Sequence, residues 1–376
     1  MSDTDHPDSG TITVKSTRLA TLEGFLLAHG LETWAPIDGE TLARGLDSGL
    51  PTGPEAMQMA RQATLQANGQ ACVQAVSSGA RGAIAVALPY DPRPAVGIGD
   101  TDLSGGPAPY LRVGAFASAH RYAALARLLK AVAKKLAAVT GHPYASFRVA
   151  VNSRLPEKRL VELSGLGCRG RSDLLLTYAY GPACILGVLL LPFDPLEATE
   201  PDHIWGNDAG TAPLSPCGTC RACADACPGR AIVGDAECCT SFSVPGSSQT
   251  YHRESCIQHW MSTMDEPPQA LRPAFAGRLY GCDACILACP LSVRAWQPDR
   301  SDGSSPASRA DALLLPGERR PGSLVSAPFL ARADDAELKA FFRKTALGLS
   351  WFGPGMLRHN AALAGSDRGR GGSAGI

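Results

Sequence analysis

Ten cysteines gathered in one short stretch constrain this chain more than any other feature of its sequence. The chain has 376 residues and 13 cysteines, and ten of these lie between Cys217 and Cys289. The first group reads C-x2-C-x2-C-x3-C-P up to Pro228, and the second reads C-x2-C-x3-C-P up to Pro290. An odd number of cysteines at this density predicts a metal centre rather than a disulfide framework.

The first spacing is that of bacterial ferredoxins, in which the last cysteine of the run binds a different [4Fe–4S] cluster from the others. Two such clusters need eight thiolates, so the two motifs and one isolated cysteine suffice. We predict that the first cluster is bound by Cys217, Cys220, Cys223 and Cys289, and the second by Cys227, Cys256, Cys282 and Cys285. Cys238 and Cys239 remain alternatives to Cys256. Zinc is the alternative metal, although zinc sites prefer two C-x2-C pairs for each ion.

Apolar runs outside the cysteine segment predict a mixed α/β domain. Residues 82–89, 147–151 and 183–191 have the pattern of buried strands, and residues 115–139 carry a leucine stripe typical of a long helix. We expect an α/β domain over residues 11–200, a two-cluster domain over 201–297 and a loop followed by helices over 298–365. The polar, glycine-rich ends, 1–10 and 366–376, are predicted to be disordered tails.

Charge and hydropathy limit the partners of the chain. The 35 basic and 35 acidic residues balance, but residues 112–171 contain twelve Lys or Arg and only two Glu. This local excess predicts contact with nucleic acid, and a solvated helix face is the alternative. The longest apolar run, 183–191, is too short to cross a bilayer, which takes about 20 residues. Because the N-terminus is acidic and polar, we expect no signal peptide, no membrane contact and a cytoplasmic protein.

Several blocks along the chain resemble the epoxyqueuosine reductase family. Cys256-Ile257 is similar to the isolated cysteine ligand of that family, which favours Cys256 over the adjacent pair. The block Leu279 to Cys285 is close to the tyrosine-glycine-cysteine-aspartate segment of the family. The remaining blocks that carry the resemblance are residues 87–90, 151–153, 164–171, 181–187 and 357–362. Together they extend over about residues 80–365.

The resemblance implies the fold, the cofactors and the partners. It implies an α/β cobalamin-binding reductase domain, then a bacterial ferredoxin-like domain with two [4Fe–4S] clusters and a short helical C-terminus. The implied reaction removes the epoxide oxygen of epoxyqueuosine in tRNA, with electrons from an external donor such as a ferredoxin or flavodoxin. The residues implied to contact cobalamin are Asn152, Gly170, Arg171, Asp283 and Ala284. We expect the protein to be a monomer.

The sequence departs from the family in the substrate half. Asn152 stands where the family has the aspartate that is its proposed proton donor, and an amide has no proton to give near neutral pH. Arg171 replaces a lysine. The acid could be replaced by His120, Tyr122 or Cys168. These changes favour, as an alternative, a related reductase acting on another small molecule. An electron carrier that is not an enzyme is a second alternative, although an α/β segment of about 200 residues is more than a carrier needs.

Overall fold

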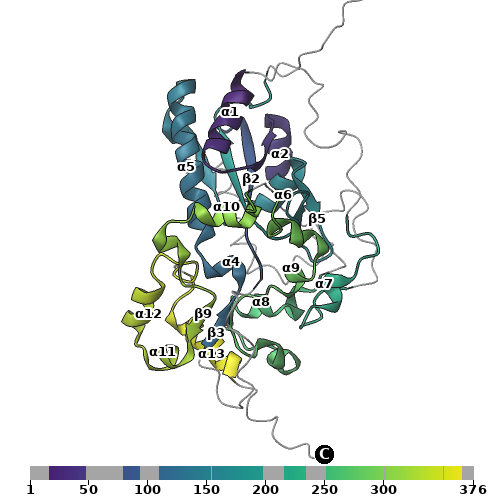
Figure 1. The fold of residues 1–376 in the computed structure, drawn as a ribbon, viewed down its shortest axis with the longest axis vertical. Helices are drawn as coiled ribbons and strands as arrows, with labels where there is room; N and C mark the ends of the chain where they lie inside the picture. The colour runs from purple at the N-terminus through teal and green to yellow at the C-terminus, as the bar shows by residue number, and fades with distance from the viewer. Residues whose placement is uncertain are drawn as a thin grey trace, which may run out of the picture.

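The computed structural model of the chain contains a four-stranded antiparallel sheet at its centre (Figure 1). It describes residues 17–47, 79–93, 110–153, 155–197, 216–233, 251–299, 302–349 and 351–365. The strands of the sheet, in spatial order, are β1 (Thr33–Ile37), β2 (Gly82–Pro89), β7 (Cys184–Leu191) and β4 (Arg148–Ala150). The strands predicted over 82–89, 147–151 and 183–191 are therefore confirmed. The predicted tails lie outside the described residues.

Both faces of this sheet are covered by helices, which explains why its strands are apolar along their whole length. Ile84, Val86 and Leu88 of β2 share a core with helix α5 (Arg121–Thr140), and α1 (Thr17–Ala28) packs beside α5. Ala83 and Ala85 point to the other face, because successive side chains in a strand alternate. That face is covered by α2 (Gly39–Asp47) and α6 (Glu157–Leu163).

The predicted helix over 115–139 is divided into two. A short helix, α4 (Ala115–Ser118), precedes α5, and Ala119 between them has an extended backbone. Helix α5 ends at Gly141, which adopts the left-handed conformation that glycine favours at helix ends. The expected leucine stripe is buried against the sheet. Gly187 of β7 permits this close packing, because a Cβ atom there would lie 2.8 Å from the side chain of Leu125.

Two smaller sheets join segments that are far apart in the sequence. In the first, β3 (Tyr110–Val113) lies between β8 (Arg278–Tyr280), which is parallel to it, and β9 (Leu324–Ser326), which is antiparallel. Its three strands come from the three predicted regions 11–200, 201–297 and 298–365, so these regions share a core rather than folding side by side. The second is a hairpin of β5 (Gly167–Arg169) and β6 (Leu175–Thr177).

The cysteine segment consists of turns and very short helices. These helices are α7 (Ala222–Asp225), α8 (Ile257–Trp260) and α9 (Ala284–Leu287). The 3-10 helices of the described residues are Tyr144–Ser146, Arg253–Ser255, Gln269–Phe275, Pro290–Ala295 and Pro316–Arg319. Such irregular backbone is typical of a region that is organised by side chains rather than by a long hydrogen-bonded ladder.

The C-terminal region contains more regular structure than the sequence suggested. The prolines of residues 298–328 predict a loop-rich stretch, yet it contains α10 (Pro306–Ala312), β9 and the start of α11 (Ala327–Arg332). The hydroxyl of Ser305 caps α10 by accepting the backbone N–H of Ser308, and Pro306 occupies the first turn, where its missing N–H costs nothing. Helices α12 (Asp335–Phe342) and α13 (Pro354–Gly365) are the last elements of the described residues and lie at the end of the molecule away from α1 (Figure 1).

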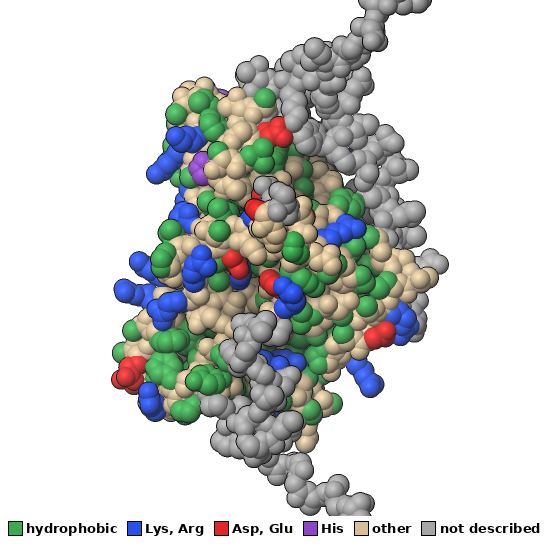
Figure 2. Space-filling model, viewed as in Figure 1, with side chains coloured by type: hydrophobic (Ala, Val, Ile, Leu, Met, Phe, Trp, Pro, Cys, Tyr) green, Lys and Arg blue, Asp and Glu red, His purple; other side chains and the backbone are tan. Residues whose placement is uncertain are grey.

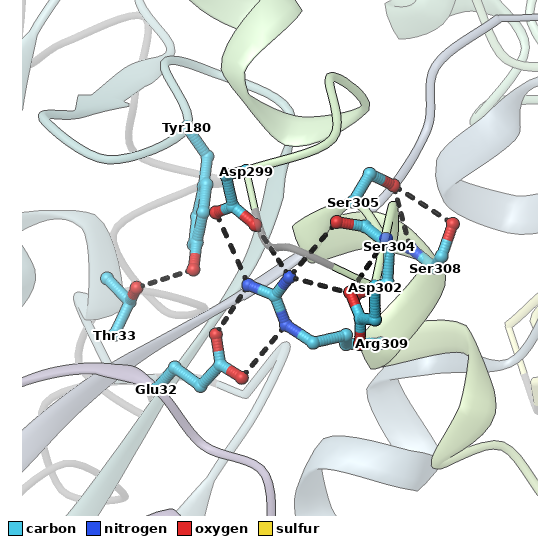
Figure 3. Close-up of polar contacts among 9 residues, drawn as sticks. All are labelled: Glu32, Thr33, Tyr180, Asp299, Asp302, Ser304, Ser305, Ser308 and Arg309. Carbon is cyan, nitrogen blue, oxygen red and sulfur yellow. Dashed lines mark hydrogen bonds and ion pairs between the residues drawn. The ribbon is translucent and has the colours of Figure 1, made fainter.

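An ion-pair network ties α10 to the main sheet (Figure 3). The guanidinium of Arg309 donates to both carboxylate oxygens of Glu32, at 3.0 and 2.8 Å, and to Asp299 at 2.7 Å. The side chain of Arg309 is 19% exposed and that of Glu32 is 28% exposed, so solvent screens the pair only in part. Nearby, the Thr33 hydroxyl donates to the Tyr180 hydroxyl at 2.8 Å. The network joins residues more than 250 positions apart.

Removing Arg309 is expected to destabilise the fold. Arg309→Ala leaves two neighbouring carboxylates without their shared cation, which should lower the free energy of unfolding by about 1–3 kcal/mol. Arg332→Ala, on the exposed end of α11, is the matched control and should change it by less than about 0.5 kcal/mol. Chemical denaturation of the two variants measures the difference, and equal midpoints would show that the network does not stabilise the fold.

Candidate functional site

The first set of thiols surrounds the turn that precedes α7. The pKa of the Cys223 thiol is raised to about 11, chiefly by burial and then by three nearby thiols, those of Cys217, Cys289 and Cys220. The backbone N–H of Cys220 donates to the carbonyl of Cys217 at 2.7 Å, which closes the turn. Cys289 follows α9, a helix that packs against α7. The structure thus brings together the four thiols predicted for the first cluster.

The second set of thiols lies beside the first. Burial raises the pKa of the Cys285 thiol well above its usual value, and the nearby thiols raise it further; these are Cys282, Cys256, Cys223 and Cys227. Cys227 comes from the first motif but lies with the second, just as Cys289 comes from the second motif but lies with the first. This crossed arrangement is the one that the spacing predicts for two clusters. Cys238 and Cys239 lie outside the described residues.

The ten described cysteines are all free thiols. Among the described residues, no three His, Cys, Asp or Glu side chains are arranged to hold a single metal ion. The zinc–sulfur distance of about 2.3 Å would place four thiolates about 3.8 Å apart around a zinc ion. The thiolates around an iron–sulfur cluster each bind a different iron, so their sulfur atoms lie farther apart. The donor set, four thiols in each group, suits that cluster.

A cavity of about 450 Å³ separates the thiols from the main sheet. All four thiols of the second set line this cavity, and none of the first set does. Its walls are mostly apolar and aromatic, with the following contributing: Tyr90, Phe116, Tyr122, Leu174, Ile185 and Ile232. Its volume lies in the range of about 300–1,000 Å³ that is usual for small-molecule sites. A small-molecule cofactor or substrate in this cavity would therefore be next to the second set of thiols.

Asn152 lies on the cavity wall, just after β4. Its φ angle of 51° is in the left-handed region, which asparagine tolerates better than most residues. Tyr122, at the start of α5, also lines the cavity, and burial holds the pKa of its hydroxyl far above the usual value. The structure therefore brings one predicted site residue, Asn152, and one candidate proton donor, Tyr122, to the same space.

Glu157, which no sequence motif singles out, carries the one carboxyl group among the described residues that line the cavity. Glu157 is the first residue of α6, and its Oε1 accepts the backbone N–H of Ser153 at 2.7 Å. Its charge also raises the pKa of Tyr122, which indicates that the two groups are close. Its position directly after Pro156 was a usable signal, because proline is common where a helix begins and acids favour the first turn.

Lys158 lies next to Glu157 on the same wall. Its ammonium group donates to the backbone carbonyl of Asp173 at 3.0 Å. Burial lowers the pKa of Lys158, while the Asp173 carboxylate raises it. The cavity therefore carries one acid and one base side by side in the sequence, and both follow Asn152 by five or six residues.

The other residues predicted to bind cobalamin are divided between the cavity and its surroundings. Ala284 lines the cavity, whereas Gly170, Arg171 and Asp283 are not among the lining residues. One carboxylate oxygen of Asp283 accepts the backbone N–H of Ala115 at 2.8 Å, and the other is buried without a hydrogen-bond partner. Burial raises the pKa of Asp283 to about 6, although the Ala115 hydrogen bond opposes the shift. Its contact with a cofactor stays a prediction.

Two candidate proton donors lie away from the cavity wall. Cys168 is buried in β5 and does not line the cavity. His120 precedes α5, and its backbone N–H donates to the carbonyl of Glu318. Burial lowers the pKa of His120, while the charge of Glu318 raises it. Neither residue is placed to give a proton to a molecule in the cavity.

A mixed α/β fold thus holds eight thiols in two groups, and the second group lines an apolar cavity. The known proteins that this chain resembles are epoxyqueuosine reductases. The chain is 33% identical over 164 residues to the epoxyqueuosine reductase of Salmonella typhimurium, covering 42% of this chain and 35% of that protein. It is 30% identical over 229 residues to that of Gloeobacter violaceus, covering 59% and 60%. No protein-family model matches the chain.

Solved structures show the same fold. The epoxyqueuosine reductase of Streptococcus thermophilus matches with a TM-score of 0.61 and 18% identity, covering 93% of this chain and 81% of that one. An epoxyqueuosine reductase crystallised with an epoxyqueuosine-modified tRNA stem loop matches with a TM-score of 0.55 and 18% identity, covering 92% and 80%. The chain is therefore similar to epoxyqueuosine reductases in sequence and in fold. Its alignments span between about a third and three fifths of the curated relatives reported above.

Proposed function

We propose that the chain is an iron–sulfur and cobalamin-dependent reductase that converts epoxyqueuosine in tRNA to queuosine. The observation that carries this proposal is that four thiols of the second set form one wall of a cavity. A substrate with polar atoms also needs polar side chains in the cavity, and Asn152 and Glu157 provide them. The names of the relatives and of the matching structures support the reaction.

The division of labour along the chain follows from this proposal. Residues 11–200 form the cobalamin and substrate domain, and residues 201–297 form the ferredoxin-like domain that holds both clusters. Residues 298–365 close the molecule, since β9 and helix α10 contact both of the preceding regions. The shared core between β3, β8 and β9 would hold the two redox parts at a fixed distance.

Electrons would enter at the first cluster and leave from the second. Cys220 of the first set is exposed, whereas the second set lines the cavity. An external carrier such as a ferredoxin or flavodoxin would therefore deliver electrons to the first cluster. Cys223 is close enough to Cys285 for the two thiols to interact electrostatically, so the two clusters would be neighbours. This order needs no large movement of the chain.

The chemistry balances with two electrons and two protons. Both C–O bonds of the epoxide break, a C=C bond forms, and the oxygen leaves as water. Cobalamin bound in the cavity would supply a two-electron reductant at the substrate. The protein must supply the proton to the departing oxygen, and Glu157 is the acid that the cavity offers. Asn152 would hold the substrate oxygen by a hydrogen bond from its amide.

Contact with tRNA rests on the exposed basic residues. Part of the local excess of charge is neutralised by acids from elsewhere, because Arg121 pairs with Asp311 and Arg127 with Glu318. Three lysines of α5 remain exposed, Lys130, Lys134 and Lys135. Figure 2 shows Lys and Arg side chains along the side of the molecule that α5 forms. Such a surface binds phosphates with a strong salt dependence.

Complementation tests the proposed reaction. The chain is expressed in cells that lack their own epoxyqueuosine reductase, and tRNA nucleosides are quantified by mass spectrometry. We expect epoxyqueuosine to fall and queuosine to appear, with tRNA binding that weakens steeply as salt rises. Unchanged epoxyqueuosine, in cells where the protein carries about eight irons, would rule out this substrate. A binding affinity that does not respond to salt would rule out phosphate contact.

The second candidate function is reduction of a different small molecule by the same machinery. Asn152 favours it, since the family that the chain resembles has an acid at this position and Asn152 lines the cavity. The same purified protein, supplied with a chemical reductant and a synthetic epoxide or organohalide, separates the two functions. Turnover of the small molecule without any effect on tRNA would support the alternative.

No helix in the described part of the chain has both the length and the apolar character required to span a bilayer.

A further inference from the structure

Arg171 connects the main α/β region to the first cysteine loop. It directly follows the β5 strand and Gly170, and only 2% of its surface is exposed. Its backbone N–H donates to the Sγ of Cys217 at 3.5 Å. Its guanidinium donates to three backbone carbonyls of the cysteine segment, namely those of Cys220 at 3.1 Å, Gly218 at 3.0 Å and Val233 at 3.5 Å.

The shape of the guanidinium explains this set of contacts. Its donors lie in one plane and point in fixed directions, so one side chain can hold carbonyls on both sides of a turn. In the turn at Cys217 to Cys220, the carbonyls of Gly218 and Cys220 are not part of a regular helix or strand, so a side chain can donate to them. A lysine has one ammonium group at the end of a flexible chain and cannot hold the same carbonyls together.

The β5–β6 hairpin gives Arg171 a rigid base. The backbone N–H of Gly170 donates to the carbonyl of Leu174 at 2.8 Å. A Cβ atom at Gly170 would lie 2.6 Å from the side chain of Leu176, so this position packs tightly and favours glycine. Because the hairpin fixes the backbone at Gly170, the following guanidinium is directed at the cysteine loop.

The charge of Arg171 also bears on the electron that a cluster would accept. A reduced cluster carries one more negative charge than the oxidised cluster, so a buried cation beside it stabilises the reduced form. A backbone N–H bond to a ligating sulfur acts in the same direction, because it withdraws negative charge from the sulfur. Both effects reach the first set of thiols through one residue.

We propose that Arg171 is a positioning residue that shapes the first cysteine loop for its cluster and raises the reduction potential of that cluster. The inference rests on the proposed function, because it requires a cluster bound by the first set of thiols. It assigns Arg171, at the end of the block 164–171, a role in electron entry. Reduction of a substrate in the cavity would then depend on the contact between Arg171 and the first cysteine loop, although Arg171 does not line the cavity.

Two substitutions separate the shape of Arg171 from its charge. Arg171→Lys keeps the charge but loses the planar donors, and we expect it to lose at least half of the iron of the first cluster after anaerobic purification. Arg171→Gln keeps a planar donor but loses the charge. We expect its first cluster to show at least a tenfold lower ratio of reduced to oxidised form at a fixed potential, equivalent to 59 mV for one electron.

Arg169→Lys is the matched control, because Arg169 lies two residues away and pairs with Asp173 at 2.8 Å. Iron content and a redox titration followed by electron paramagnetic resonance give the readouts. Full iron and an unchanged potential in both Arg171 variants would overturn the inference. Absence of iron in the unchanged protein would instead overturn the proposed function.

Hydrogen exchange of the unchanged protein provides a test that does not depend on variants. The amide of Arg171 should exchange at least tenfold more slowly after the clusters are reconstituted than before, because its acceptor, Cys217 Sγ, becomes fixed. Equal exchange in the two states would contradict the proposed contact, even if the variants fail to fold.

Discussion

If the proposed function holds, Cys282→Ser is expected to lower the reductase activity by at least about 100-fold and the iron content from about eight to about four per chain. Cys282 lies in the second set of thiols, which lines the cavity. A serine hydroxyl remains protonated near neutral pH and is a poor ligand for iron, so the second cluster should be lost. Without it, electrons that reach the first cluster have no route to the cavity.

Cys184→Ser is the control for this prediction. Cys184 lines the same cavity but belongs to neither set of thiols, and burial raises the pKa of its thiol to about 12. It is expected to keep about eight irons and most of its activity. Iron analysis and a single-turnover assay measure both variants. Full iron in Cys282→Ser would show that this thiol is not a ligand, and zinc in place of iron would refute the cluster assignment altogether.

Glu157→Gln is expected to slow the reductive step by about 100- to 10,000-fold, the usual contribution of a positioned acid or base. The amide has nearly the same size as the carboxyl, so the cavity and the hydrogen bond from Ser153 should persist. Iron content should not change. The rate should be measured under single-turnover conditions, so that electron delivery and product release do not limit it.

Glu162→Gln and Asn152→Asp sharpen this experiment. Glu162 lies on the same helix, pairs with Arg159 and does not line the cavity, so its variant should keep the original rate. Asn152→Asp places a carboxyl on the same wall. The double variant Asn152→Asp, Glu157→Gln should therefore react at least tenfold faster than Glu157→Gln alone. An unchanged rate in Glu157→Gln would show that the proton comes from another group, for which Tyr122 is the remaining candidate on the wall.

The grouping of the thiols could be predicted from the sequence because it depends on spacing within short loops. Cysteines two residues apart face one cluster whatever the rest of the chain does, and the proline after each run marks its end. The strands over 82–89 and 184–191 could likewise be predicted, because a continuous apolar run fits a strand that is covered on both faces. Both signals are local.

The cavity could not be predicted, because its walls come from segments that are far apart in the chain. Glu157 is an ordinary acid in the first turn of a short helix until α6 is packed against the sheet and faces the cysteine segment. Arg171 was assigned to a cofactor by resemblance, yet its guanidinium holds the carbonyls of the first cysteine loop. The sequence does not reveal whether such a basic or acidic side chain will line the cavity or contact the first cysteine loop.

The sequence by itself determined the two groups of thiols, the main apolar strands and the resemblance to the epoxyqueuosine reductases. Only the tertiary structure decided that β3 pairs with β8 and β9, that the second set of thiols faces the cavity, and that Glu157 is the acid there. The physical reason is the separation along the chain of the residues that determine each feature. Cluster spacing and strand patterns arise from neighbours along the chain, whereas a cavity is made by side chains that meet only after folding.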